Sequence, residues 1–189
     1  MSKGIVIDGN EIVYGYRGKG YTLNELKTKC DMYQKVYKAD PDNEYKKRME
    51  KSKLDGSLCE QESLLPGEFL EKYSENPDFE VSNLGRFWYQ KRLIHQKEIK
   101  RGYFVFDFED FKSRNNNKSI GKFNRNFLYT YQFVAAVFLE KKEGYGDVHH
   151  ITNDGCDISA SNLIYLTRDY HNWIHGNSFN QEVDGNEEE

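Results

Sequence analysis

The sequence predicts an α+β protein, because strand-like and helix-like segments both occur and their order changes along the chain. Near the C-terminus the order is strand, loop, strand, helix, whereas at the N-terminus a strand-like segment precedes a capped helix. The chain has 189 residues, of which 37% are hydrophobic and 15% aromatic. This is enough for one or two small domains with hydrophobic cores, and two small domains fit better than one.

The first 60 residues contain a hairpin pattern and one helix. Residues 4–7 and 11–14 are strand-like and are joined through an Asp-Gly turn at Asp8, which predicts a hairpin. Thr22 and Glu25 have capping-box spacing, so we expect a helix to begin after Thr22. One face of this helix carries Leu23, Leu26, Cys30, Tyr33 and Tyr37. A basic patch at residues 46–53 then precedes a predicted linker at residues 54–63.

The middle of the chain is basic and aromatic. Residues 83–130 contain 11 basic and four acidic residues, a net charge of +7, although the whole chain has a formal charge of −4. Cations and aromatic rings together are what a phosphate-binding surface requires, but a solvated sheet face over an aromatic core gives the same pattern. The polar residues 115–119 predict a hairpin tip. The candidate phosphate-binding residues are Arg86, Lys91, Arg92, Lys97, Lys100, Arg101, Arg114 and Lys118.

Four of the five histidines lie within 28 residues near the C-terminus. His149 and His150 are neighbours on a predicted strand, where adjacent side chains point to opposite faces, so both cannot face one ion. His171 and His175 are four residues apart on a predicted helix, where such side chains share a face. The pattern predicts a metal site with a second imidazole left over for proton transfer. We expect His95, outside this cluster, to be structural or solvated.

The elements around these histidines can be read from the same segment. A strand begins near Gly146, a polar loop covers residues 152–161, and a second strand covers residues 163–166. Thr167, followed by Asp169 in the first turn, predicts the N-cap of a helix.

In order and spacing, His150, Asn162 and His171 resemble the signature residues of HNH endonucleases, which are nucleases of the ββα-metal class. Two upstream segments extend the resemblance to phage and intron-encoded homing endonucleases. Residues 131–138 resemble the apolar helix that precedes their HNH strands, and residues 65–69 and 79–87 resemble their small nuclease-associated module.

The resemblance implies four parts in the chain. Residues 128–178 would form the ββα-metal HNH domain, preceded by a small β-rich DNA-binding module at residues 64–127. Residues 179–189 would be a disordered acidic tail. Residues 1–60 have no recognised family, and three roles stay open for them: a further DNA contact, a protein-interaction hairpin, or packing for the nuclease core.

The resemblance also implies roles for single residues. His150 would be the general base, and an imidazole whose unperturbed pKa is near 7 suits that task. Asn162 would hold the loop and the His150 ring. His149 and His171 would bind one divalent metal ion, and His175 matches an extra helix histidine of HNH nuclease toxins. Mg²⁺ or Mn²⁺ is the first expectation, with Zn²⁺ or Ni²⁺ as alternatives because His149 replaces a usual carboxylate or amide.

Other interpretations stay open for these residues. A closed structural zinc site would need a fourth ligand, for which Cys156 or Asp154 could serve, although paired Cys-x-x-Cys motifs are missing from the sequence. Asn162 could be a plain turn residue. The order Asn153-Asp154-Gly155 also departs from the family's usual D-G-N.

The expected function is metal-dependent hydrolysis of phosphodiester bonds in double-stranded DNA, by a monomer or a homodimer. The alternative is a catalytically inactive DNA-binding protein of a phage or mobile element that keeps the HNH metal fold. Three cysteines without a spaced framework suit a reducing compartment, and the sequence has no signal-peptide pattern and no membrane span. We therefore expect a cytoplasmic protein in a bacterial host or a phage-infected cell.

Overall fold

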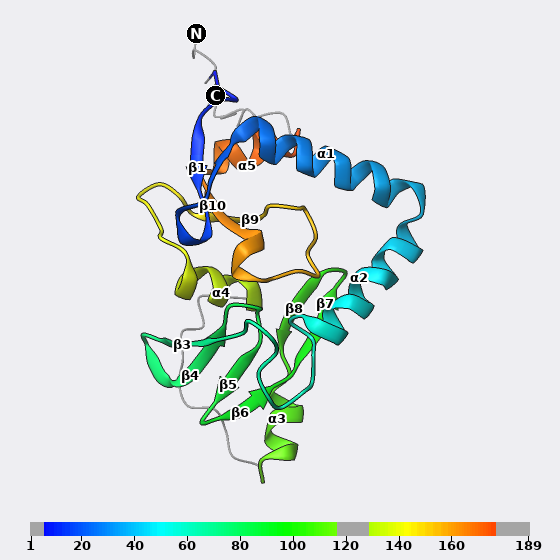
Figure 1. The fold of residues 1–189 in the computed structure, drawn as a ribbon, viewed down its shortest axis with the longest axis vertical. Helices are drawn as coiled ribbons and strands as arrows, with labels where there is room; N and C mark the ends of the chain where they lie inside the picture. Colours follow the sequence, from blue (N-terminus) through cyan, green and yellow to red (C-terminus); the bar gives the residue numbers. More distant parts are fainter. Residues whose placement is uncertain (1–5, 117–128, 177–189) are drawn as a thin grey trace, which may run out of the picture.

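Two helices from the N-terminal region arch around the C-terminal strands in the computed structural model, which describes residues 6–116 and 129–176 (Figure 1). The fold is α+β, as predicted. Strands β1 (Ile12–Tyr14) and β2 (Gly20–Thr22) form an antiparallel pair, joined by the 3-10 turn η1 (Tyr16–Gly18). Helix α1 (Leu23–Ala39) follows, and helix α2 (Pro41–Asp55) descends beside the β-rich part of the molecule.

The start of α1 confirms the predicted capping box. Thr22 Oγ1 accepts a hydrogen bond from the Glu25 amide at 3.1 Å, and the Glu25 carboxylate accepts one from the Thr22 amide at 2.7 Å. The strand expected at residues 11–14 pairs with β2, and residues 6 and 7 of its expected partner are not in a strand, while residues 4 and 5 lie outside the described residues. The turn after Asp8 does form, but the backbone that leaves it bonds to the start of α1, with the Asn24 amide 2.8 Å from the Gly9 carbonyl.

The middle of the chain forms two separate antiparallel sheets. Strands β3 (Leu70–Tyr73), β4 (Asn76–Ser82), β5 (Phe87–Tyr89) and β6 (Arg92–Ile94) make a four-stranded sheet in that order, and β7 (Gln96–Lys100) pairs with β8 (Tyr103–Phe106). Helix α3 (Phe108–Arg114) follows, where the sequence suggested a strand before a hairpin tip. Asp107 caps this helix by accepting from the Asp110 amide, which explains the difference.

The C-terminal elements have the predicted order. Helix α4 (Thr130–Phe138) precedes strand β9 (Asp147–His150), a long loop ending in the 3-10 turn η2 (Ala160–Asn162), strand β10 (Leu163–Leu166) and helix α5 (Arg168–Ile174). β9 and β10 are antiparallel, with Ile164 opposite His149. The predicted N-cap of α5 is confirmed, since Thr167 Oγ1 accepts from the Tyr170 amide at 3.2 Å.

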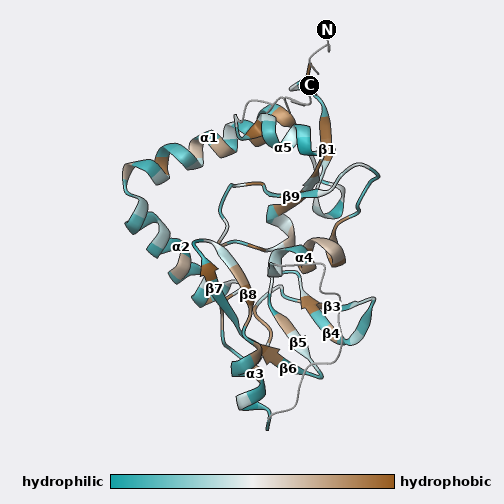
Figure 2. Ribbon diagram, turned by 180° about the vertical axis from the view of Figure 1, so that it is seen from behind, coloured by the Kyte–Doolittle hydropathy of each residue, from teal (hydrophilic) through white to brown (hydrophobic). Residues whose placement is uncertain are grey.

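Two hydrophobic clusters hold these elements together, and both cross the predicted domain boundaries. One joins the four-stranded sheet and β8 to α4 and β10, through side chains such as Phe79, Phe87 and Phe133. The other joins Leu26 and Cys30 of α1 to residues of β10 and α5. Strands such as β6 and β8 are hydrophobic along much of their length, whereas α2 is largely hydrophilic (Figure 2). The N-terminal region therefore packs against the C-terminal strands and helix.

Arg86 corrects two predictions at once. Its side chain is 1% exposed, so it is not available to bind a phosphate group on the surface. It pairs with the buried Glu68 and donates hydrogen bonds to the backbone carbonyls of Cys59, Gln61 and Ser63. A buried guanidinium needs such partners, and here the segment predicted as a linker supplies them. Residues 54–63 are therefore fixed against the sheet.

Some predictions concern residues outside the described ranges. Lys118, most of the expected hairpin tip at residues 115–119 and the tail at residues 179–189 fall there. Asn115, which is described, is buried and caps the end of α3. Among residues 6–116 and 129–176, no helix has the length and apolar character needed to cross a membrane.

Candidate metal centre

Three of the predicted ligands meet between β9 and α5. His149 is 2% exposed and points from β9 toward α5, where His171 lies in the last turn and His175 is the C-cap. One nitrogen from each imidazole lies within 4.8 Å of the others, so these three residues could hold a metal ion. His149 Nδ1 and His175 Nε2 are 3.2 Å apart. Two nitrogen ligands of one tetrahedral zinc ion, each at about 2.0–2.1 Å, would lie about 3.3 Å apart.

A second layer of side chains contacts the two helix histidines. Cys30 Sγ, from α1, lies 3.5 Å from His175 Nδ1. Asp147 Oδ2, from the start of β9, lies 3.7 Å from His171 Nδ1, and the other carboxylate oxygen of Asp147 pairs with Arg168. Both contacts involve Nδ1, which leaves Nε2 of each helix histidine to face an ion. Outer contacts of this kind fix the orientation of ligating imidazoles.

The residues present fit a cation with nitrogen ligands. Nδ1 of His149 faces His175 Nε2, and the buried Asp147 Oδ2, near His171, has no hydrogen-bond partner in the described part of the chain. Burial, and then the charges of His175 and His171, lower the pKa of His149 to about 2. Burial also lowers the pKa values of His171 and His175. All three imidazoles are therefore neutral at pH 7, as metal coordination requires.

His150 lies on the other face of β9, as the strand periodicity predicted. Its ring packs edge-on against Tyr131 of α4, with the ring centroids 4.9 Å apart. Nε2 of His150 is buried and, within the described residues, has no hydrogen-bond partner. Burial lowers the pKa of His150 to about 4, although Asp154 opposes this shift. The strand thus separates one metal-facing imidazole from a second, neutral imidazole.

Asn162 fixes the loop that follows His150. Its Oδ1 accepts hydrogen bonds from the backbone amide and the hydroxyl of Thr152, at 3.0 and 2.9 Å, and its Nδ2 donates to the Asp157 carbonyl at 2.7 Å. The Asn162 carbonyl also accepts from the Ile151 amide at 2.7 Å. These contacts fit the predicted loop-holding role and act on the backbone next to His150, without a hydrogen bond to its ring.

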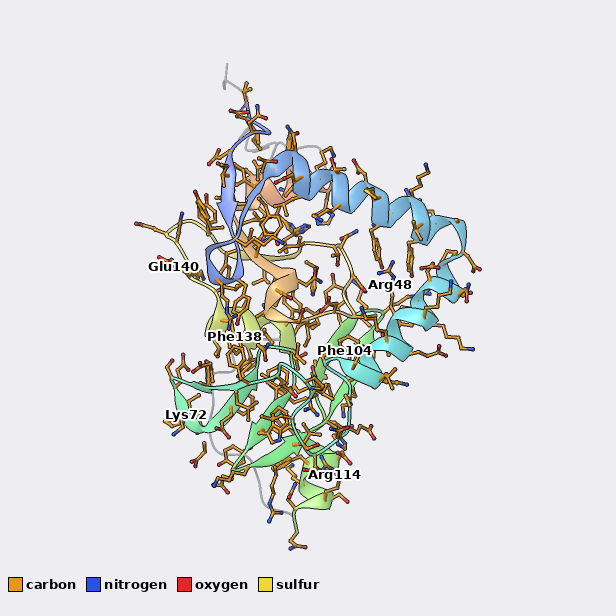
Figure 3. The ribbon with its side chains drawn as sticks, in the orientation of Figure 1. Arg48, Lys72, Phe104, Arg114, Phe138 and Glu140 are labelled. Carbon is orange, nitrogen blue, oxygen red and sulfur yellow. The ribbon has the colours of Figure 1, made fainter. Side chains whose placement is uncertain are left out.

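The proposed fourth ligands of a closed zinc site have other partners. Asp154 forms an ion pair with Arg48 of α2 at 2.9 Å and accepts from the Cys156 amide at 3.0 Å, and Figure 3 shows Arg48 on the inner side of α2. Cys156 is buried in the cluster that joins the sheet to α4. Of the residues that the structure describes, only three histidines form the ligand group.

The basic residues of the middle region fall into two groups. Arg92 contacts Asn115, while Lys97, Arg101 and Arg114 form ion pairs with Asp107, Asp42 and Asp110. Lys91, in the β5–β6 turn, and Lys100 are exposed and have no ion-pair partner among residues 6–116 and 129–176. These two lysines are the most available cations of the predicted set.

Sequence reasoning missed the contributions of α1 and α2 to this region. Cys30 stood on the predicted buried face of α1, but nothing in the sequence linked it to a histidine 145 positions away. Arg48 was noted only as part of a basic patch. Asp147 could have been found, because an acid precedes the tandem histidines on the same strand.

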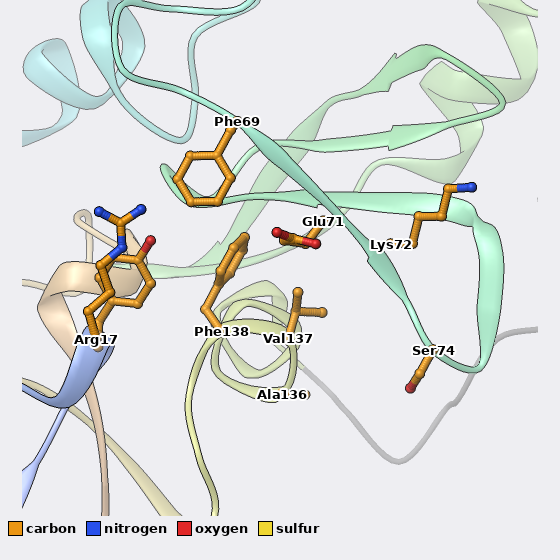
Figure 4. Close-up of a pocket in the computed structure, with 9 residues that line it drawn as sticks. Arg17, Phe69, Glu71, Lys72, Ser74, Ala136, Val137 and Phe138 are labelled. Carbon is orange, nitrogen blue, oxygen red and sulfur yellow. The ribbon is translucent and has the colours of Figure 1, made fainter.

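One hollow of the molecule lies away from the histidines. It has a volume of about 370 Å³ and lies between η1, β3 and α4, where Phe69 faces Phe138 beside Arg17 (Figure 4). A second hollow, of about 260 Å³, is lined by His150 and by residues of α1, α2, the β7–β8 turn and the loop after β9. The second hollow reaches His150, the neighbour of the candidate ligand His149.

Comparison of the chain with protein-family models, with curated proteins and with solved structures finds no match. The geometry of the four histidines is therefore the basis for a functional proposal. It combines three imidazoles that could hold a metal ion with His150, on the opposite face of the same strand, whose Nε2 has no hydrogen-bond partner in the described chain.

Proposed function

We propose that this protein is a metal-dependent DNA endonuclease of the HNH type, with α4, β9, β10 and α5 as its ββα-metal domain. The observation that carries the proposal is that the two neighbouring histidines of β9 point to opposite faces of the strand. His149 converges with His171 and His175, while the adjacent His150 presents its ring to the opposite face. A metal site with a separate, neutral imidazole is an arrangement that supports phosphodiester hydrolysis.

The metal proposal favours Zn²⁺ or Ni²⁺ over Mg²⁺ or Mn²⁺, which the sequence had put first. All three candidate ligands are imidazole nitrogens, and magnesium prefers oxygen ligands. When bound by His149, His171 and His175, the ion would polarise the scissile phosphate and stabilise the leaving oxygen.

The other residues have roles that follow from their contacts. Nε2 of His150, which lacks a partner in the described chain, would accept the proton of an attacking water. Asn162 is a positioning residue, because it holds the backbone of Thr152 and Ile151 beside His150. The exposed Lys91 and Lys100 would contribute to phosphate binding by the β-rich region.

The test is cleavage of supercoiled plasmid by the purified protein with Zn²⁺, Ni²⁺, Mn²⁺ or Mg²⁺. We expect nicked or linear product that disappears with EDTA, and a loss of about 100- to 10,000-fold in rate for His150→Ala, the range for a general base. His95→Ala is the matched control, because His95 pairs with Asp110 far from the cluster in sequence. Cleavage that survives in His150→Ala would remove His150 from the mechanism.

The alternative function is a DNA-binding protein that keeps the metal centre without cleaving. This outcome would appear as DNA binding by the wild-type protein in a gel-shift assay, together with no product in any metal. Loss of both binding and cleavage in His150→Ala would instead indicate that His150 is structural.

A further inference from the structure

A pocket beside His150 has the features of a nucleobase site. It has a volume of about 260 Å³, far above the roughly 30 Å³ that one water molecule occupies. Tyr33 and Tyr37 of α1 and Tyr45 of α2 line it on one side, and Asn153 and His150 line it on the other. The N-terminal helices, to which the sequence assigned no role, therefore form one wall of a hollow that reaches the proposed general base.

The helical wall of the pocket is a stack of tyrosine rings and guanidinium planes, which begins with Arg48 at 4.4 Å from the Tyr33 ring. The rings of Tyr33 and Tyr37 are nearly parallel, at 13°, with their centroids 5.4 Å apart. The guanidinium of Arg101, from the β7–β8 turn, lies 4.3 Å from the Tyr45 ring and 5.3 Å from the Tyr37 ring. Nucleobases stack on tyrosine rings and on arginine planes, and each such contact is tolerant of sequence.

The charges around the pocket suit a base better than a phosphate. Arg101 donates to Asp42 and to the Pro41 carbonyl, and Arg48 pairs with Asp154, so both cations already have acidic partners. An additional anion would gain little there. The amides of Gln34 and Asn153, which also line the pocket, can instead donate to and accept from the polar edge of an uncharged ring.

Two glycines hold the walls of this pocket at a fixed distance. Gly102, with φ +74°, and Gly155 bring the β7–β8 turn against the loop after β9. A Cβ atom at Gly155 would lie 2.6 Å from the Gly102 carbonyl oxygen, so the two backbones are in direct contact. The pocket is thus built on backbone contacts as well as on long side chains.

We propose that this pocket binds one unpaired base of the DNA strand, next to the phosphate that is cut. The inference rests on the proposed nuclease function and names its substrate class. A base in the pocket would be joined through its own backbone to a phosphate at His150, on the face of β9 opposite His149. A base inside a stacked duplex must be flipped out before it can enter such a pocket, and this costs least for an unpaired base, so the preferred substrate carries a bulged, mismatched or single-stranded nucleotide at the cleavage position.

The test uses the fluorescent base 2-aminopurine in a short duplex, either bulged or fully paired. Phosphorothioates on both sides of the probe prevent cleavage by the wild-type protein, which is titrated in the presence of Zn²⁺. We expect quenching and tighter binding for the bulged duplex alone. Tyr37→Ala should weaken that binding by about 5- to 100-fold, the range for loss of one stacking contact, and leave binding of the paired duplex unchanged.

Two controls separate a lost contact from a damaged fold. Tyr37→Phe keeps the ring and should bind the bulged duplex as the wild-type protein does. Tyr14→Ala removes an exposed tyrosine of β1 outside the pocket and should also have no effect. Equal affinity of the wild-type protein for the two duplexes, or unchanged binding in Tyr37→Ala, would overturn the proposal.

Comparison of the binding result with the plasmid assay distinguishes failure of the pocket proposal from failure of the nuclease proposal. Cleavage of plasmid together with no preference for the bulged base would overturn the pocket proposal and leave the nuclease proposal standing. Quenching that depends on Tyr37, together with no cleavage in any metal, would support the pocket and overturn the nuclease proposal.

Discussion

Two buried ionisable residues of the protein differ in their partners. Arg86 lies just before β5 of the four-stranded sheet, and His149 lies in the candidate metal centre. The guanidinium of Arg86 donates to Glu68 and to three backbone carbonyls. His149 Nε2 has no hydrogen-bond partner in the described residues. An unpaired buried polar atom costs about 1–3 kcal/mol. The charge of Arg86 is therefore paired within the fold, whereas β9 holds a buried imidazole nitrogen that the described residues leave unpaired.

Buried polar groups that have partners stabilise the fold, whereas buried polar groups without partners point to a functional site. Partly unpaired polar atoms of Asp147, His149 and His150 occur within four consecutive residues of β9. Such groups in a native fold call for an explanation, and binding of an ion or a substrate is one. The four predictions below test this difference, in order of decreasing expected effect.

The largest effect is expected from Arg86→Leu, which leaves the Glu68 carboxylate buried without its cation. We predict a loss of about 3–5 kcal/mol in the free energy of unfolding, measured by urea denaturation. Lys100→Ala, an exposed cation, is the control and should change this free energy by less than about 0.5 kcal/mol. A loss below about 1 kcal/mol in Arg86→Leu would show that the pair does not hold the sheet.

The same pair gives the stability of the wild-type protein a defined pH dependence. Burial alone would raise the pKa of Glu68, but hydrogen bonds from Arg86, Leu65 and Ser82 outweigh burial and lower it. A carboxyl whose pKa is lower in the folded state stabilises the fold above its unfolded-state pKa of 4.5, and this stabilisation is lost as the pH falls further. Arg86→Leu should reduce this acid dependence.

The second effect concerns the ligands of the candidate centre. We predict that His149→Ala and His171→Ala each lower Zn²⁺ affinity by more than the roughly 100-fold upper range of an outer contact, because a donor atom is removed. Isothermal titration calorimetry measures the change. Added Zn²⁺ at about 100 times Kd should also stabilise the wild-type protein by about 2.7 kcal/mol.

The control for the ligand variants is His95→Ala, which removes a histidine paired with Asp110 outside the cluster. Its Zn²⁺ affinity should equal that of the wild-type protein. Equal affinity in His149→Ala as well would exclude that residue from the ligand set.

The third effect is smaller, because Cys30 contacts the centre through another residue. Cys30 Sγ lies 3.5 Å from His175 Nδ1 and fixes the ring whose Nε2 faces His149. We predict that Cys30→Ala lowers Zn²⁺ affinity by about 10- to 100-fold, as expected for an outer partner of a ligating histidine. Cys59→Ala removes another buried cysteine, which does not contact the candidate ligands, and should not change Zn²⁺ affinity. Equal affinities in the two variants would make Cys30 a packing residue only.

Local patterns explain which parts of the fold could be predicted. The capping box at Thr22 depends on residues three apart, and the opposite faces of His149 and His150 follow from strand geometry, so both were correct. The burial of Arg86 depends on Glu68, 18 residues away, and the Cys30 contact spans 145 residues. Neither distance leaves a periodic signal in the sequence. Charge counting failed at Arg86 for this reason.

The smallest effect tests where DNA would bind on the β-rich region. Each phosphate neutralised by a cation adds about 0.9 to the slope of log affinity against log salt concentration. Lys91 is exposed without an ion-pair partner in the described chain, whereas Arg92 already contacts Asn115. We therefore predict that replacing both by Ala lowers the slope by about 1, nearer to one phosphate than to two.

Fluorescence anisotropy with a labelled duplex, between about 50 and 200 mM salt, measures this slope. Lys46→Ala with Lys53→Ala is the matched pair, because these exposed lysines lie seven residues apart and share one face of α2. If only the α2 pair lowers the slope, DNA follows the outer side of α2 and the sheet face is structural. If only the Lys91 and Arg92 pair does, the sheet supplies the phosphate contacts, and α1 and α2 are left to act at the pocket beside His150.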